Sequence, residues 1–129
     1  LEYDQGFFVR NGDGAADVKP IAHLYKSQVY ALAAHLGVPG EILRRPPTTD
    51  TYSLAQTQEE FYFSLPYGLM DLCLYGLNNG IPAAGVAGAT GLTADEVERV
   101  WADIAAKRKV ARCLNMEPLL VEPVAQGGG

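Results

Sequence analysis

Residues 6–26 read GFFVRNGDGAADVKPIAHLYK, and this run sets the expectation for how the chain folds. Its aromatic start, FFV at 7–9, is typical of the end of a β-strand. The NGDG segment at 11–14 follows, and Gly and Asn there can adopt the positive φ angles of a tight turn. We therefore predict a strand end that leads into a loop, ahead of a helix.

The residues that follow carry the spacing and the end signals of helices. Apolar residues recur every three or four positions over 21–36, and Gly37 and Pro39 end that pattern. We expect a short helix over 40–43, and then an extended path that Pro46 and Pro47 force through 48–50. Residues 51–64 fit either a lid or a short helix.

Two more helices are predicted in the second half of the chain. Helical spacing returns over 66–78 and ends at an Asn-Asn-Gly stop signal. Residues 82–91 are rich in Ala and Gly without a strong period, so we assign them no structure. Thr93 and Glu96 have the spacing of a capping box, and the helix behind them places cations at 107–109, where its dipole favours them. The tail over 118–129 is predicted to be flexible.

Composition limits the class of protein. The chain has 129 residues and a net charge of -5, which suits one domain and argues against a nucleic-acid surface. Its apolar runs are shorter than the roughly 20 residues of a membrane span. Cys73 and Cys113 fit reduced, buried thiols, which suggests a cytoplasmic protein. The chain starts at Leu1 without an initiator Met, so we expect a fragment.

The NGDGAAD segment at 11–17 offers two chemical interpretations once calcium is set aside. A calcium loop needs Gly at its sixth position and Glu at its twelfth, where this chain has Ala16 and Ala22. A Gly-rich turn with Asp17, flanked by Arg10 and Lys26, suits a phosphorylated ligand that carries hydroxyls. The alternative is a hairpin turn with solvated charges. His23 and His35 lack partners at metal spacing, so we interpret them as surface or packing residues.

Four motifs in order resemble those of the NAD synthetases. They are Gly6 to Asp17, Pro20 to Lys26, LGVP at 36–39 and PTTD at 47–50, with a weaker fifth match, QTQEE, at 56–60. The resemblance implies an ammonia-dependent ligase. ATP would adenylate the carboxylate of deamido-NAD, and ammonia would displace AMP, with Mg²⁺ neutralising charge on the leaving pyrophosphate.

The resemblance also implies a set of site residues and a fold. The metal ligand would be Glu2, the ATP-binding residues Lys26 and Thr48, and the deamido-NAD-binding residues Arg10, Asp17 and Lys107. Arg10 stands where the family usually has Lys, and Ala106 where it has His. Residues 1–117 would be the C-terminal part of a Rossmann-like α/β enzyme of the adenine nucleotide alpha-hydrolase type, as a mainly helical segment.

One family motif does not occur in the chain. The S-G-G-x-D-S loop, which holds the ATP pyrophosphate, is absent, so we expect these residues to be inactive alone and the missing part to precede Leu1. The resemblance further implies a homodimer. Two other hypotheses stay open: a non-catalytic assembly module, and another amide-forming ATP pyrophosphatase. The sequence does not decide whether the ammonia is free or derived from glutamine.

Overall fold

The computed structural model describes residues 1–8, 12–47, 62–114, 116 and 121–122. Every regular element within these residues is a helix, so the described part is mainly α, as predicted. The predicted strand end is wrong for Phe7 and Phe8, which lie in irregular backbone, while Val9 is outside the described residues. The rings of Phe7 and Tyr62 pack with their centroids 4.7 Å apart, so side-chain packing holds the segment.

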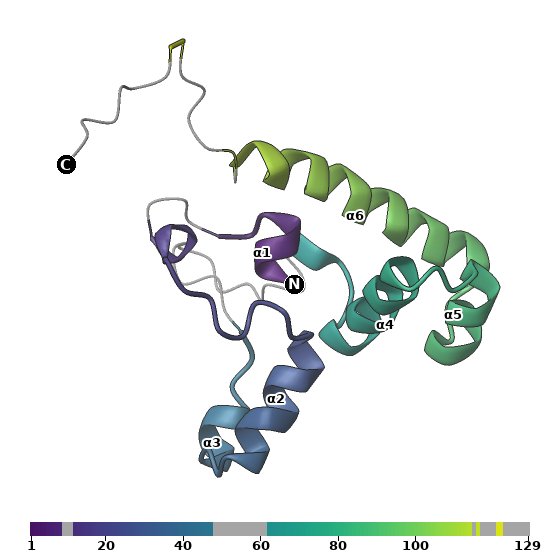
Figure 1. Cartoon of the computed structure of the whole chain (residues 1–129). Coiled ribbons are helices and arrows are strands. Elements are labelled where there is room, and N and C mark those ends of the chain that lie inside the picture. The colour runs from purple at the N-terminus through teal and green to yellow at the C-terminus, as the bar shows by residue number, and fades with distance from the viewer. Residues whose placement is uncertain (9–11, 48–61, 115, 117–120, 123–129) are drawn as a thin grey trace.

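Helix α6 (Ala94–Leu114) is the longest element and spans one side of the molecule (Figure 1). The predicted capping box is confirmed at its start. The Thr93 N–H donates to Glu96 Oε2 at 2.8 Å, and the Glu96 N–H donates to Thr93 Oγ1 at 3.3 Å. These bonds satisfy two donors that have no partner within the helix.

Helix α4 (Tyr67–Asn78) lies beneath α6 and confirms the prediction for 66–78. Its apolar side chains meet those of α6 in the main core. The buried members of this core are Leu1, Phe63, Tyr67, Met70, Leu74 and Ile104. The Trp101 indole N–H donates to the Cys73 carbonyl at 2.8 Å, which ties the two helices together. Both cysteines are free; Cys73 is buried as predicted, but Cys113 is exposed.

Helix α5 (Ala83–Thr90) occupies the segment to which we assigned no structure, so that prediction is wrong. Pro82 precedes its first residue, and Gly91, with φ of 77°, ends it. The helix packs between α4 and α6, where Val86 is buried with Cys73 and Val97. Its sequence shows no amphipathic period. Small Ala and Gly residues let the helix pack closely against two neighbours, so it does not need a stripe of large apolar side chains.

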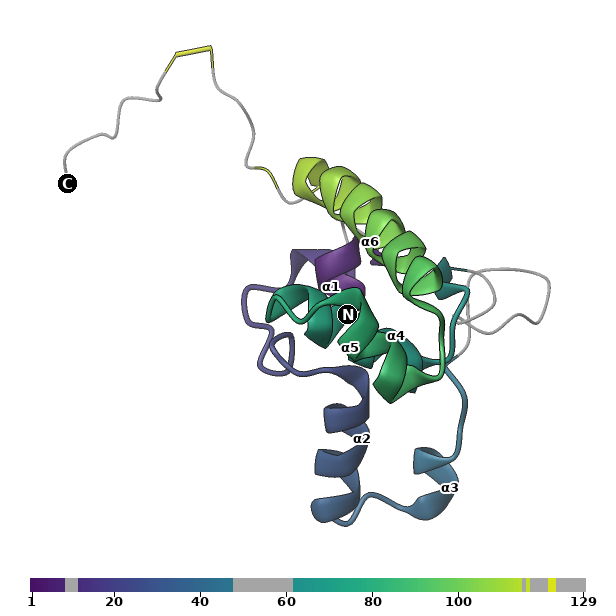
Figure 2. The ribbon, with the colours of Figure 1, turned by 90° about the vertical axis from the view of Figure 1, so that its right-hand side faces the viewer.

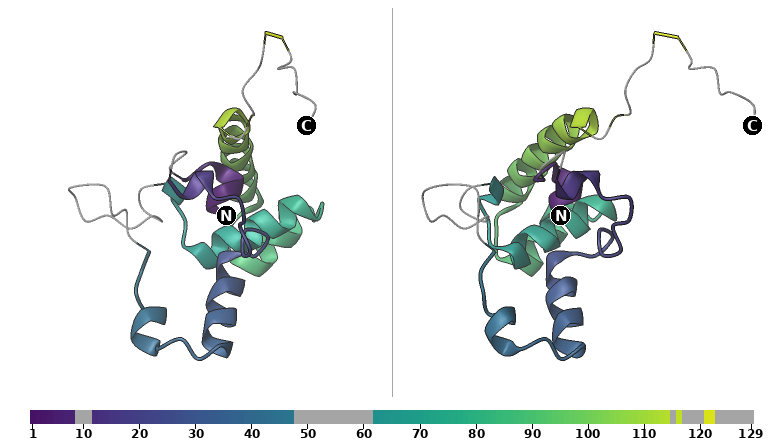
Figure 3. Two further views of the ribbon diagram at one scale, coloured as in Figure 1. Left: turned by 60° about the vertical axis from the view of Figure 1, so that its left-hand side comes forward. Right: turned by 90° about the vertical axis from the view of Figure 1, so that its left-hand side faces the viewer.

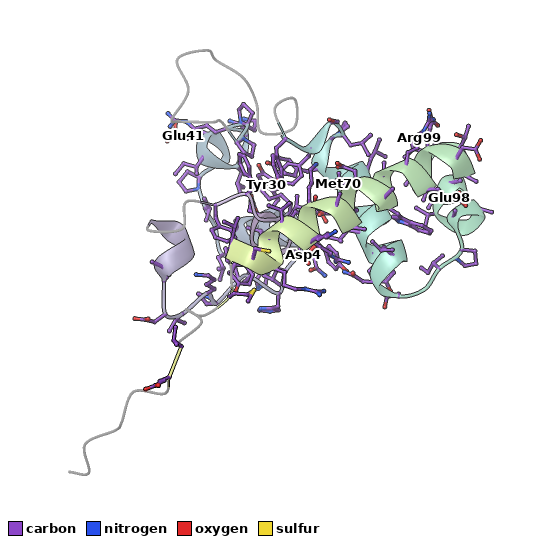
Figure 4. The ribbon with its side chains drawn as sticks, turned by 90° about the horizontal axis from the view of Figure 1, so that it is seen from above. Asp4, Tyr30, Glu41, Met70, Glu98 and Arg99 are labelled. Carbon is purple, nitrogen blue, oxygen red and sulfur yellow. The ribbon has the colours of Figure 1, made fainter. Side chains whose placement is uncertain are left out.

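Helix α1 (Glu2–Gln5) lies against the C-terminal half of α6. Gly6 ends it with φ of 80°, a left-handed conformation that Gly adopts without strain. A Cβ at Gly6 would come within 2.9 Å of the Ala111 Cβ, so a side chain there would push the two helices apart. In Figure 4 Asp4 lies beside α6, as the contact between α1 and α6 requires.

Helices α2 (Lys26–His35) and α3 (Gly40–Leu43) form an arm that projects away from α6 (Figures 2 and 3). The prediction for 40–43 is confirmed. The predicted helix over 21–36 starts too early, because residues 21–24 form turns and α2 begins at Lys26. None of the described helices has both the length and the apolar character that a bilayer crossing needs. The predicted tail over 118–129 lies almost entirely outside the described residues.

Candidate functional site

A cleft of about 370 Å³ opens between α1, the turns over 19–24 and the start of α2. Its wall combines apolar side chains with the charged groups of Glu2, Lys19 and Lys26. The apolar and aromatic members are Leu1, Tyr3, Phe8, Ile21, Ala22, Leu24 and Val29. The cleft therefore brings together Glu2 and Lys26, two residues that sequence analysis assigned to one site.

Glu2 and Lys26 form an ion pair on this wall. Lys26 Nζ donates to Glu2 Oε1 at 2.7 Å, and the side chains are 20% (Lys26) and 32% (Glu2) exposed. Burial, the largest single influence, raises the pKa of Glu2, but hydrogen bonds from Lys26 and the backbone, with the Lys26 charge, bring the pKa below its usual 4.5. Lys26 Nζ also lies 5.2 Å from the centre of the Tyr67 ring. Glu2 is therefore a carboxylate at neutral pH, and its partner cation is fixed in place.

The position of Lys26 depends on a carboxylate from another helix. Asp71 of α4 accepts hydrogen bonds from the Lys26 N–H at 3.3 Å and from the Ser27 N–H at 2.6 Å. Asp71 is only 5% exposed, so these two donors compensate for its burial. The negative charge also suits the positive end of the α2 dipole. Asp71 thus fixes where α2 starts and, with it, where the Lys26 side chain leaves the backbone.

Tyr3 and Lys19 also line the cleft. Lys19 Nζ donates to the carbonyls of Gly14 at 3.1 Å and Ala16 at 3.0 Å, so it ties the turn η1 (Asp13–Ala15) to the segment that directly follows it. The same ammonium lies 5.4 Å from the centre of the Tyr3 ring. The wall therefore offers a cation and an aromatic face to an anionic, ring-containing ligand.

Comparison with known families gives this geometry its context. The NAD synthase family model matches residues 1–111. The chain belongs to the NAD synthase family. The match includes every described residue of the cleft, so the Glu2–Lys26 pair is part of the NAD synthase domain.

Relatives within the NAD synthase family are highly similar. The NH(3)-dependent NAD(+) synthetase of Rhizobium meliloti (strain 1021) is 75% identical over 98% of this chain and 38% of its own length. That of Rhizobium rhizogenes (strain K84 / ATCC BAA-868) is 70% identical over 96% and 37%. The one of Hyperthermus butylicus (strain DSM 5456 / JCM 9403 / PLM1-5) is 42% identical over 74% and 34%. The chain thus spans less than two-fifths of these relatives.

Of the other residues assigned from the family motifs, the two that the structure describes, Asp17 and Lys107, do not line this cleft. Asp17 is exposed and is not among the residues that line the cleft. Arg10 and Thr48 lie outside the described residues. Lys107 is 15% exposed, and its Nζ donates to Asp103 Oδ2 at 2.6 Å and to the Tyr62 carbonyl at 2.5 Å. Its ammonium also lies 4.5 Å from the centre of the Tyr62 ring, so Lys107 has several partners within the chain.

Sequence reasoning missed three residues that shape this site: Tyr3, Lys19 and Asp71. Tyr3 precedes the first matched motif and Lys19 lies between the first two, and nothing in their own spacing marks them. Asp71 could have been recognised from the sequence, because it is the only charged residue in the apolar segment 66–78. A buried carboxylate in such a segment needs donors, and the first backbone N–H groups of another helix, which have no partner within that helix, supply them.

The donor set fits one protein ligand to Mg²⁺. Glu2 is a hard oxygen donor that stays ionised, on the wall of a cleft large enough for phosphate groups. Within the described residues, no three His, Cys, Asp or Glu side chains gather as a metal cage. Mg²⁺ commonly takes only one or two carboxylates and completes its shell with water and phosphate oxygens. A single carboxylate beside a lysine ammonium is compatible with that pattern.

Proposed function

We propose that this chain is the C-terminal part of an ammonia-dependent NAD synthetase, and that the cleft between α1 and α2 forms part of its ATP site. The observation that carries the proposal is the Glu2–Lys26 pair, with 2.7 Å between Nζ and Oε1, in a chain of the NAD synthase family. A carboxylate and an ammonium side by side are the groups that a Mg²⁺-bound polyphosphate needs.

The proposed reaction has two steps. A carboxylate oxygen of deamido-NAD attacks the α-phosphorus of ATP, and pyrophosphate leaves with the electrons of the broken P–O bond. Ammonia then attacks the acyl carbon of this adenylate, AMP leaves, and ammonia loses a proton as the amide of NAD forms. Both steps move negative charge onto phosphate oxygens, which a fixed cation stabilises.

Lys26 and Glu2 have complementary roles in this proposal. Lys26 exchanges Glu2 for an ATP phosphate, because its flexible stem lets the ammonium follow the phosphate. Glu2 would then hold Mg²⁺, whose chemistry would be to neutralise negative charge on the phosphate oxygens. The ion pair seen here keeps Glu2 ionised and holds the Lys26 ammonium beside it before ligands arrive, which reduces the cost of organising the site.

The remaining residues assigned from the family motifs stay predictions. Thr48 is proposed to bind ATP, and Arg10 and Asp17 to bind deamido-NAD. Lys107 can reach deamido-NAD only if its ammonium leaves Asp103 and the Tyr62 carbonyl. Removal of Lys107 would therefore weaken deamido-NAD binding if it is a ligand, and would only lower stability if it is not.

The complete protein is proposed to have a Rossmann-like α/β fold, to contain the S-G-G-x-D-S loop and to act as a homodimer in the cytoplasm. This follows from the resemblance and from the relatives, of which this chain spans 38% and 37%. The missing loop would hold the pyrophosphate against the cleft described here. Catalysis by the present residues alone is not expected.

The test is an assay of the full-length protein for AMP release. The proposal predicts AMP formation that requires ATP, deamido-NAD and ammonia together, with one NAD formed for each AMP. Release of AMP without deamido-NAD would contradict the assignment. The Mg²⁺ role is tested with Glu2→Gln, which should raise the Mg²⁺ concentration needed for half-maximal rate, whereas Glu41→Gln on α3 should not.

A further inference from the structure

A second cleft adjoins the first one. It has a volume of about 420 Å³ and is lined by Tyr3, Asp4, Ala22, Arg108, Ala111 and Arg112. Tyr3 and Ala22 line both clefts, so the Tyr3 side chain stands between them. The two clefts therefore form adjacent parts of one surface between α1, the turn at Ala22 and the C-terminal half of α6.

Arg108 is fixed in this second cleft by three acceptor contacts. Its Nε lies 3.0 Å from each carboxylate oxygen of Asp4, and its Nη2 donates to Asn78 Oδ1 at 2.7 Å. These contacts come from α1 and α4 and leave Nη1 without a described acceptor. Since an arginine has five N–H donors, the guanidinium keeps donors for a ligand.

Arg112 lies one helical turn further along α6, on the same face as Arg108. Its side chain is exposed, and no acceptor for it is found within residues 1–8, 12–47 and 62–114. The dipole of α6 favours a cation in this last turn, but it supplies no hydrogen-bond acceptor in the cleft. Arg112 therefore presents its guanidinium to the second cleft.

The charge of the second cleft is opposite to that of the chain. Two guanidinium groups face one carboxylate, Asp4, in a chain whose net charge is -5. Like charges one turn apart repel each other, and an anion between them would relieve that repulsion. The planar fork of arginine matches the oxygens of a phosphate group. A phosphate is thus the ligand that this pair suits.

We infer that the second cleft binds a phosphate group of the nucleotide whose other part occupies the Glu2–Lys26 cleft, with Arg112 as a ligand and Arg108 as its fixed neighbour. This inference rests on the proposed function, since it extends the same site. The base of the cleft is rigid, because Ala111 is 2% exposed and packs against Gly6. Tyr3 offers its ring as the shared wall. The phosphate belongs either to ATP or to deamido-NAD.

The test compares Arg112→Gln with Lys109→Gln in the full-length protein. Lys109 is an exposed cation on the same turn of α6 and does not line the cleft, so it controls for the loss of one charge. Calorimetric titration with inorganic pyrophosphate should show binding at least about tenfold weaker in Arg112→Gln than in Lys109→Gln. Equal affinities would overturn the inference, as would a wild-type protein that does not bind pyrophosphate.

Steady-state kinetics then identify the source of the phosphate. A rise in KM confined to ATP assigns the cleft to ATP, and a rise confined to deamido-NAD assigns it to that substrate. Arg112→Lys keeps the charge without the fork and should fall between wild type and Arg112→Gln. If pyrophosphate binding depends on Arg112 but no NAD forms, the proposed function fails while the phosphate site stands.

Discussion

The ammonium of Lys26 lies 2.7 Å from the carboxylate of Glu2, although 24 residues separate them in the chain. This contact joins the short helix α1 at the N-terminus to α2 of the projecting arm, and it places the first charged side chain of the sequence in the candidate site. The turns over 19–24 lead directly to Lys26 at the start of α2.

The Glu2–Lys26 pair makes stability depend on pH. The pKa of Glu2 is lower in the folded chain than its usual 4.5. As the pH falls through this range, the unfolded chain therefore binds more protons at Glu2 than the folded chain does. The stabilisation is complete above the unfolded-state pKa and is lost as the pH passes through the lower folded-state pKa. The free energy of unfolding should therefore fall more steeply with acid in wild type than in Glu2→Gln, as measured by denaturant titration between pH 6 and pH 3.

Glu41→Gln is the matched control for this experiment. Glu41 lies on helix α3, at the end of the arm that projects away from α6 (Figure 1), and no ion pair is described for it among the residues that the structure covers. Its acid dependence should follow that of wild type. Identical curves for wild type and Glu2→Gln would show that the pair contributes nothing to stability.

Asp71 of α4 should stabilise α2, although it lies far from α2 in the sequence. Asp71→Ala removes the acceptor for the N–H groups of Lys26 and Ser27, so the free energy of unfolding should fall by about 1–2 kcal/mol. Leu72→Ala is the control, because Leu72 is the next residue on α4 and is 42% exposed. Chemical denaturation measures both variants, and an equal loss in the two would argue against the capping role.

The same substitution, Gly to Ala, is expected to have opposite effects at two positions of α4. A Cβ at Gly76 would clash with Val86 Cγ2, whereas a Cβ at Gly68 would have no neighbour within 4 Å. Gly76→Ala should cost about 1–3 kcal/mol, because α4 and α5 must move apart. Gly68→Ala should be neutral or should stabilise by up to about 1 kcal/mol. Val86→Ala should recover part of the loss in the Gly76→Ala background; no recovery would contradict the proposed clash.

Local signals in the sequence predicted two helices well. The capping box at Thr93 and Glu96 and the spacing over 66–78 lie within the elements that they specify, so α6 and α4 could be read without tertiary contacts. The same kind of reasoning failed for α5. Its Ala- and Gly-rich residues form a helix because Gly76 lets Val86 approach α4, a contact that no local pattern reveals.

The start of α2 was also predicted incorrectly, because the sequence pattern placed it too early. Apolar spacing continued back to Ile21, but the helix begins where Asp71 accepts the N–H groups of Lys26 and Ser27. The capping carboxylate lies 45 residues from Lys26, so a tertiary contact acts at this boundary beside the local bond from the Tyr25 N–H to Gln28 Oε1. The candidate site was likewise predicted only in part. Motif resemblance identified Glu2 and Lys26, whereas Tyr3 and Lys19 were identified only from the structure.

The most direct test of the account measures NAD formation from deamido-NAD, ATP and ammonia by the full-length protein with Lys26→Met, beside Lys109→Met as the control. A charge-assisted contact to phosphate is worth roughly 1.5–3 kcal/mol, so Lys26→Met should lower kcat/KM for ATP by about 10- to 100-fold. Lys109→Met should match wild type, because Lys109 lies on an exposed part of α6. Equal kcat/KM values for Lys26→Met and Lys109→Met would contradict the assignment of the cleft to ATP.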